Sequence, residues 1–118
     1  MAYDSNNVFA KIIRGEIAAN KVYEDEKVLA FHDISKTAPT HVLVIPKGDY
    51  LDFSDFAAKA KSEEISHFFQ KVSEVANLVE AQKSGFRLIS NMGLDANQSV
   101  AHFHVHILAG KNLGPLIA

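Results

Sequence analysis

The sequence predicts an α+β fold with an antiparallel sheet of about five strands, one long helix and a short helix near the N-terminus. Segments rich in β-forming residues come in blocks rather than alternating with helices. The connections between neighbouring blocks are short, which favours antiparallel pairing. Only one long segment repeats its apolar residues at helical spacing, so one helix is expected to cover one face of the sheet.

The N-terminal half is expected to contribute the short helix and three strands. Apolar spacing predicts a helix over residues 8–14, with Asn7 as its N-cap and Gly15 ending it. Pro46 ends the third strand, because proline has no N–H to donate to a neighbouring strand. The strands predicted in this half cover residues 21–24, 27–34 and 41–45.

The C-terminal half is expected to hold the long helix and two further strands. A helix is predicted from Ser62, its expected N-cap, to about Gln82, with Lys83 and Gly85 marking its end. The apolar positions that recur along it at steps of three and four are Ile65, Phe68, Phe69, Val72, Val75, Ala76 and Val79. The other expected segments are an irregular or short-helical stretch over 50–61, strands over 86–92 and 100–108, a polar loop over 93–98 and a tail over 110–118.

Length and composition limit the classes of protein to which this chain can belong. Its 118 residues fit a single domain over residues 1–118. Apolar residues make up 47% and charged residues 22%, which excludes a disordered chain and a membrane bundle. The net charge of −2 argues against nucleic acid as a partner, and no apolar run is long enough to enter a membrane. The absence of cysteine excludes disulfides and thiolate chemistry, and the polar first residues are unlike a signal peptide, so the cytoplasm is the expected compartment.

Three of the six histidines alternate with apolar residues in the last predicted strand, as His102, His104 and His106. Because successive side chains of a strand point to opposite faces, the three imidazoles are expected on one face and the intervening apolar side chains in the core. A chance polar face would require three rare residues to coincide. The Cα atoms of the outer two would lie ~13 Å apart, so one zinc ion with bonds of ~2.1 Å does not easily bind both. No metal is therefore expected, although two of the three could chelate one with partners from another strand.

The remaining interpretation of this row is catalysis on an anionic substrate. Neutral imidazole is a nucleophile near pH 7, and protonated imidazole is a donor and an acid. Attack on phosphorus would form a phosphohistidine, whose P–N bond exchanges at little cost for a P–N bond in the substrate. Water would then complete the hydrolysis. Just upstream, Asn97, Gln98 and Ser99 can donate hydrogen bonds to phosphate oxygens, with Asn91 near them; a plain turn is the alternative for that segment.

Several segments together resemble the histidine-triad (HIT) superfamily of nucleotide hydrolases and transferases, and in particular its Hint branch. The superfamily signature is His-x-His-x-His followed by two apolar residues, here residues 102–108. The segments similar to the Hint branch are VFAKII at 8–13, AFHDIS at 30–35 and APTHVLVIPK at 38–47. The resemblance extends from about residue 8 to residue 110 and implies a HIT-like fold.

The resemblance implies a role for each matching residue. His104 would be the nucleophile, His106 would hydrogen-bond the phosphate and His102 would orient His104. Ser99, with Gln98, would contact the phosphate and the leaving group. Asp33 would bind the ribose hydroxyls, and the apolar residues would line the purine slot, with core packing as the alternative. The nucleotide-binding set implied in this way is Asp33, Ile34, Asn91, Asn97, Gln98, Ser99, Val8, Phe9, Ile12, Phe31 and Leu43.

The sequence departs from the family pattern at several positions. Transferase members carry glutamine at the place of His106, so histidine there favours hydrolysis. Some bacterial relatives form a zinc site from two cysteines and two histidines; Asn7 and Ala10 stand at the places of the cysteines, so that site is expected to be absent, although His41 and His102 remain. Asn97 replaces a glycine, and asparagine is the residue next best suited to a left-handed backbone.

The other two histidines are expected to have no catalytic role: His32 is assigned a structural role and His67 a solvated surface position. The tail over 114–118 lacks the aromatic residue of some relatives.

The resemblance implies a hydrolase of purine nucleoside phosphoramidates of the adenosine 5′-phosphoramidate type, working through a nucleotidyl-phosphohistidine without a cofactor. It would release a nucleoside monophosphate such as AMP or GMP and an amine. Alternatives are a dinucleoside polyphosphate or aminoacyl-adenylate hydrolase, a non-catalytic nucleotide-binding adaptor, and a histidine metal carrier. The family is typically homodimeric, and an uncovered edge strand would make such pairing favourable.

Overall fold

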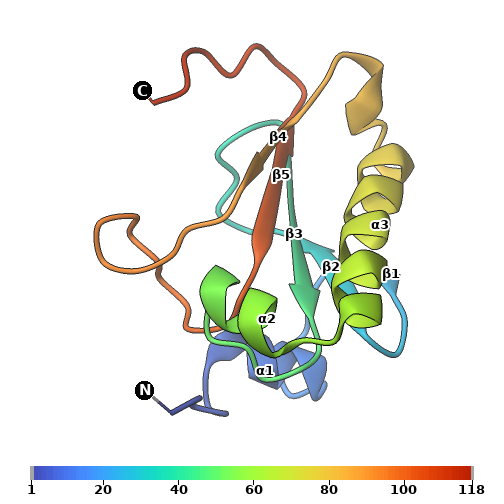
Figure 1. Ribbon diagram of the computed structural model, residues 1–118. Coiled ribbons are helices and arrows are strands. Elements are labelled where there is room, and N and C mark those ends of the chain that lie inside the picture. The colour runs from blue at the N-terminus through green and yellow to red at the C-terminus, as the bar shows by residue number, and fades with distance from the viewer. Residues whose placement is uncertain (1, 118) are drawn as a thin grey trace.

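The computed structural model describes residues 2–117 and contains one five-stranded antiparallel sheet with strand order β1-β2-β3-β5-β4 (Figure 1). The strands are β1 (Lys21–Glu24), β2 (Val28–His32), β3 (Thr40–Pro46), β4 (Arg87–Ile89) and β5 (Val105–Ala109). The helices are α1 (Val8–Ile13), α2 (Phe53–Lys59), α3 (Ser62–Leu78) and the 3₁₀ turn η1 (Ala81–Lys83). The predicted α+β class and antiparallel pairing are confirmed.

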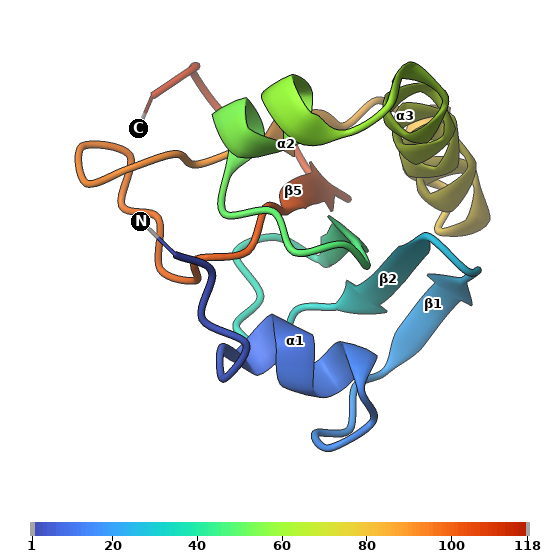
Figure 2. The same cartoon turned by 60° about the horizontal axis from the view of Figure 1, so that its bottom comes forward.

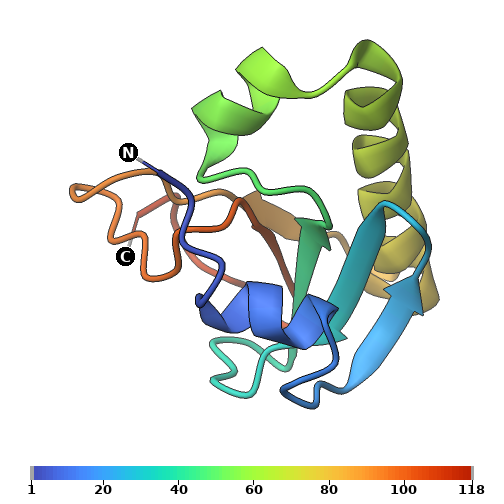
Figure 3. The ribbon, with the colours of Figure 1, turned by 90° about the horizontal axis from the view of Figure 1, so that it is seen from below.

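The sheet lies between two helical layers, with α1 on one face and α2 and α3 on the other (Figure 2). The same layers are visible from below, where α1 crosses the near end of the sheet (Figure 3). Each face has its own apolar core, because strand residues alternate between the faces. The α3 face buries Val42, Val44, Phe68, Phe103, Val105 and Ile107, among others, and the α1 face buries Phe9, Ile12, Leu29, Phe31, Leu43 and Ile45. The apolar residues between the histidines thus lie in the core, as predicted.

Helix α1 is short but well terminated. Asn7 has an extended backbone, and its side-chain oxygen accepts a hydrogen bond from the Ala10 N–H at 2.9 Å, so it is the predicted N-cap. Gly15 follows the helix with φ of 81°, a left-handed conformation that favours glycine. These two signals fix where Phe9 and Ile12 meet the sheet.

The long helix begins and ends differently from the prediction. Its N-cap is Lys61, which makes no side-chain capping bond, and Ser62 is already the first helical residue. The helix ends at Leu78 rather than near Gln82, because Glu80 takes a left-handed backbone with φ of 60° and the chain continues as the turn η1. Residues 53–59, left open between irregular and helical, form α2 with Asp52 as its N-cap.

The last two strands are shorter than predicted. β4 covers only residues 87–89 of the expected 86–92, and β5 begins at Val105 rather than at residue 100. Pairing between β3 and β5 stops at Val44 and Val105. Two residues further along β3, Pro46 has no N–H, and its carbonyl accepts a hydrogen bond from the His102 ring. Residues 100–104 therefore follow the sheet without joining it. No helix among residues 2–117 is both long and apolar enough to cross a bilayer.

Candidate active site

The histidine row lies on the α1 face of the sheet, although only His106 belongs to a strand. The ring of Phe9 in α1 meets the ring of His102 at 6.2 Å and that of His104 at 5.0 Å, measured between centroids. The rings of His104 and His106 are 5.0 Å apart. The three imidazoles therefore share one face, as the alternation predicted, even though the first two lie in the irregular segment before β5.

The environment of His104 fixes which of its nitrogens is free. The Nδ1 of His104 lies 2.7 Å from the carbonyl oxygen of His102, which can only accept, so Nδ1 carries the proton. The Nε2 of the neutral ring then keeps its lone pair, and no hydrogen bond within the protein uses it among the described residues. Burial lowers the pKa of His104, which is only 5% exposed, so the ring is neutral near pH 7. The arrangement presents a ring nitrogen with an available lone pair.

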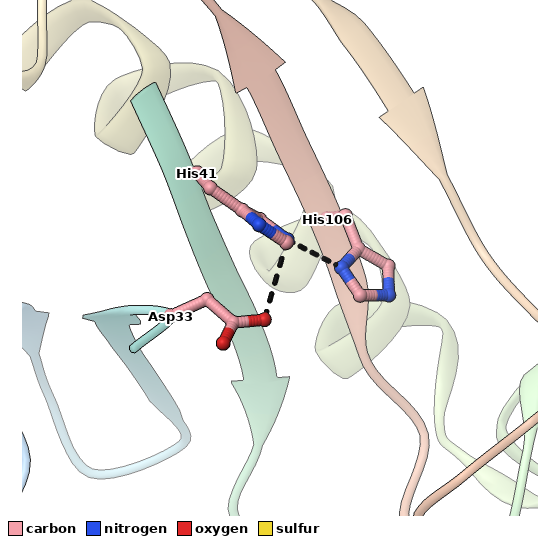
Figure 4. Close-up of side chains that lie close together, drawn as sticks. All are labelled: Asp33, His41 and His106. Atoms are coloured by element: carbon pink, nitrogen blue, oxygen red, sulfur yellow. Dashed lines mark hydrogen bonds and ion pairs between the residues drawn. The ribbon is translucent and has the colours of Figure 1, made fainter. Parts of the chain in front are cut away.

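His106 has the opposite arrangement of protons, set by a chain of hydrogen bonds. The backbone N–H of Thr37 donates to Nδ1 of His41 at 3.2 Å, so the Nε2 of a neutral His41 carries the proton. His41 Nε2 then donates to His106 Nδ1 at 2.9 Å, which leaves the proton of His106 on Nε2 (Figure 4). Burial, together with the neighbouring His104 and His41, lowers the pKa of His106 to about 4. His104 thus offers a lone pair and His106 offers a donor.

Asp33, which directly follows strand β2, lies beside His41 in this row of hydrogen bonds (Figure 4). Its Oδ2 lies 3.4 Å from His41 Nε2, and its Oδ1 accepts the Ser35 N–H at 2.8 Å. Among residues 2–117, the one cluster of three potential metal ligands is Asp33, His41 and His106, and it does not include His102. Within this cluster, His41 Nε2 and His106 Nδ1 are joined by a hydrogen bond.

A pocket of about 220 Å³ opens beside this chain, between α1 and the end of β2. Its lining is mostly apolar, with Asp33 as its acidic residue, a composition that suits a flat ring carrying hydroxyl groups. Ile34 is 99% exposed on it, so an apolar side chain stands at the rim and none of residues 2–117 covers it. The lining residues are Val8, Phe9, Ile12, Ile17, Ala18, Ala19, Asn20, Phe31, His32, Asp33, Ile34 and Leu43. All seven residues predicted for the purine slot and the ribose belong to this set, as does His32, for which only a structural role was predicted.

The polar loop before the histidine row is held by its own side chains. Asn97 has the expected left-handed backbone, with φ of 58°. The amide nitrogen of Gln98 donates to the carbonyls of Leu51 and Val100, and its oxygen accepts the Gly93 N–H. Asn91 donates to the carbonyl of Ala96 at 2.9 Å. The Gln98 and Asn91 amides thus hydrogen-bond to the backbone of the loop and of Leu51, and their contact with a phosphate stays a prediction.

Ser99 lines a second pocket, of about 320 Å³. The same pocket is lined by Gln98 and by the carboxylate-bearing Asp52. The two pockets share no lining residue, so Gln98 and Ser99 line a different pocket from the residues predicted for the purine and the ribose.

Two residues of the site escaped prediction in their actual roles. The sequence indicates His41 only as a remaining ligand of the family's zinc site, but in the structure it hydrogen-bonds to His106. The sequence predicts no role for Tyr3, whose hydroxyl lies 2.6 Å from His102 Nδ1. Their partners are 65 and 99 residues away along the chain, so no local pattern signals these contacts. His67, predicted as a solvated surface residue, keeps 36% of its side chain exposed, and its Nε2 lies 2.7 Å from Asp25 Oδ2.

The fold and the site together define an α+β protein with a histidine row beside an apolar pocket that carries one carboxylate. Comparison with known proteins gives the family: the HIT domain model matches residues 14–113, and the chain belongs to the HIT domain family. An uncharacterised HIT-like protein of Azospirillum brasilense is 56% identical over 115 residues, covering 98% of this chain and 94% of its own.

Two further comparisons connect the chain to hydrolases. The purine nucleoside phosphoramidase of Escherichia coli is 38% identical over 111 residues, covering 94% of this chain and 92% of its own. The solved structure of a HIT family hydrolase from Clostridium thermocellum matches with a TM-score of 0.87 at 36% identity, covering 98% of this chain and 99% of its own. The HIT-like fold is thereby confirmed.

Proposed function

We propose that this protein hydrolyses purine nucleoside phosphoramidates through a nucleotidyl-phosphohistidine on His104. One observation carries the proposal: the Nδ1–H of His104 is used by the His102 carbonyl, so the Nε2 lone pair of a neutral ring is free to attack. A relative that is 38% identical is named a purine nucleoside phosphoramidase, which supports the same reaction class.

In the first step, the nucleoside occupies the 220 Å³ pocket, with the purine against its apolar wall and the ribose hydroxyls at Asp33. His104 Nε2 attacks phosphorus, a new P–N bond forms, and the P–N bond of the substrate breaks. The Nε2–H of His106 donates to a phosphoryl oxygen, where charge develops in the transition state. The leaving nitrogen takes a proton from the solvent and departs as the amine.

In the second step, water attacks the phosphohistidine from the side that the amine has left. The His104–phosphorus bond breaks, the nucleoside monophosphate carries away the hydroxyl of that water, and the other proton of the water returns to the solvent. His104 returns to the neutral ring with its proton on Nδ1, because the His102 carbonyl still accepts there. No metal takes part in either step.

The test is a single-turnover assay with an adenosine 5′-phosphoramidate labelled in its phosphoryl group, run with EDTA. The wild-type protein should release the amine and form a labelled adduct on His104 that can be trapped by rapid denaturation. His104→Ala should abolish both signals, and His67→Ala, a matched change on the opposite helix, should leave both unchanged. Amine release by His104→Ala at the wild-type rate would contradict the proposal, as would complete inhibition by EDTA.

We also propose that two copies pair through the β4 edge of the sheet. β4 is one of the two edge strands, so its outer backbone groups have no partner strand among residues 2–117, and the apolar Leu88 on it is 45% exposed. Light scattering should give twice the monomer mass for the wild-type protein and the monomer mass for Leu88→Asp. A wild-type monomer at high concentration would contradict this pairing.

A further inference from the structure

We propose that Tyr3 is a positioning residue for the nucleophile His104, acting through the ring and the backbone carbonyl of His102. This inference rests on the proposed function, because it assigns a device to the same site. Tyr3 lies in the segment before α1 and does not line the nucleoside pocket.

Tyr3 and Pro46 hold the His102 ring from both sides. The Pro46 carbonyl, 2.7 Å from Nε2, can only accept, so Nε2 carries the proton of the ring. Nδ1 is then the acceptor, and the Tyr3 hydroxyl donates to it at 2.6 Å. The two rings also meet edge to face at 5.6 Å between centroids. Both nitrogens of a fully buried imidazole are therefore satisfied, and one neutral tautomer is selected.

The peptide group of His102 passes this constraint to the nucleophile. Its carbonyl accepts the Nδ1–H of His104 at 2.7 Å, the bond that leaves His104 Nε2 free. The N–H of the same peptide unit, on Phe103, donates to the Tyr50 carbonyl at 2.8 Å. Residues 102–104 precede β5, so no ladder of strand hydrogen bonds fixes this carbonyl. The side chain of His102, clamped by Tyr3, supplies an anchor that the sheet does not.

The segment that carries Tyr3 is itself tied to α1. Arg14 donates from Nη1 to the Ser5 carbonyl at 2.7 Å, and Asn7 donates from its amide to the Asp4 carbonyl at 2.8 Å. Burial raises the pKa of Tyr3, so its hydroxyl keeps the proton that it donates. The donor therefore remains in place across the pH range in which a histidine nucleophile works.

Removing the hydroxyl alone tests the inference. Tyr3→Phe leaves Nδ1 of His102 buried without a donor, so the ring is no longer restrained on that side and the orientation of His104 loosens. The single-turnover rate of the phosphoramidate should fall about three- to tenfold, the range that one hydrogen bond supports, while AMP binds as tightly as to the wild-type protein. Tyr23→Phe is the matched control: it removes a hydroxyl bonded to Asp25 at 2.8 Å, away from the site, and should leave the rate unchanged.

Nitrogen-15 spectra of the histidine rings give a second readout that needs no turnover. In the wild-type protein His102 should show the tautomer protonated on Nε2, and His104 the one protonated on Nδ1. In Tyr3→Phe the Nδ1 signal of His102 should move toward that of an unbonded nitrogen, and the ring signals of His104 should move with it. A role in folding alone would lower the unfolding temperature and leave the His104 signals in place.

The outcomes separate the two proposals. Unchanged His104 signals in Tyr3→Phe would overturn the positioning role, and so would a rate loss matched by an equal loss of AMP affinity. If the wild-type protein forms no adduct on His104, the proposed function fails, and the spectra still decide whether Tyr3 orients that ring.

Discussion

Replacing Ile34 by alanine isolates nucleotide binding from folding. Ile34 is 99% exposed, so its side chain contributes almost no burial to the folded state. Full burial of an isoleucine side chain contributes about 1.5–3 kcal/mol, and a purine lying on one side of it would cover about half. Ile34→Ala should therefore weaken AMP binding by about 1 kcal/mol, which is about a fivefold rise in Kd.

Calorimetric titration with AMP measures the change in Kd, and urea unfolding measures stability in parallel. The free energy of unfolding should stay within about 0.5 kcal/mol of the wild-type value, as for other exposed positions. Leu78→Ala, at the end of α3 on the opposite face of the sheet, is the control and should leave Kd unchanged. An unchanged Kd in Ile34→Ala would refute the placement of the base in this pocket, and an equal loss in Leu78→Ala would refute the reasoning from local burial.

Three further predictions concern the hydrogen-bond chain and the ionisable groups. His41→Ala removes the donor that sets the His106 tautomer and should lower kcat about tenfold with little change in KM; unchanged steady-state kinetics would contradict that chain. Because the pKa values of His104 and His106 are both lowered, the acid limb of kcat/KM should lie below the ordinary histidine value of 6.5, and a limb above it in a pH–rate profile would contradict this. Burial alone would raise the pKa of Asp25, but hydrogen bonds lower it to about 2; the donors are Lys27, Tyr23, His67 and Val28. The ionised carboxylate therefore stabilises the fold fully above pH 3.8, and this stabilisation is lost as the pH falls through 2. Solvent reaches a quarter of the side chain, so Asp25→Asn should cost about 1–2 kcal/mol in urea unfolding at pH 7 and almost nothing near pH 2; an equal difference at both values would count against it.

The sequence was sufficient to predict what depends on local periodicity. Alternation in residues 102–107 separated the histidines from Phe103, Val105 and Ile107, and the structure has these two sets on opposite faces. The Asn7 cap and the Gly15 stop follow from single residues whose side chain or φ angle decides the outcome. The predicted purine slot also forms one pocket, but that set came from the family resemblance and not from the pattern.

The features that the sequence could not give depend on contacts between distant segments. β5 begins five residues after the predicted start at residue 100, because the carbonyl of Pro46, on β3, accepts a hydrogen bond from the His102 ring instead of from a strand N–H. The amide of Gln98 is used by Leu51, 47 residues away, so its polar character alone did not say whether it faces a phosphate or the backbone. His67 appeared solvated from its helix alone, because Asp25 meets it only when α3 covers the turn between β1 and β2.

Phe9 lines the apolar pocket and also contacts the His104 ring, which matters for redesigning the protein. Its ring forms part of the wall against which a nucleobase would rest, and its edge meets the ring of His104 at 5.0 Å. Enlarging or reshaping that wall at Phe9 to admit a different base would also change the packing that holds the attacking imidazole. A substitution at Phe9 would therefore change base selectivity and turnover together. Ile17 and Ile34 line the same pocket and are exposed, so substitutions there can change base selectivity without changing turnover.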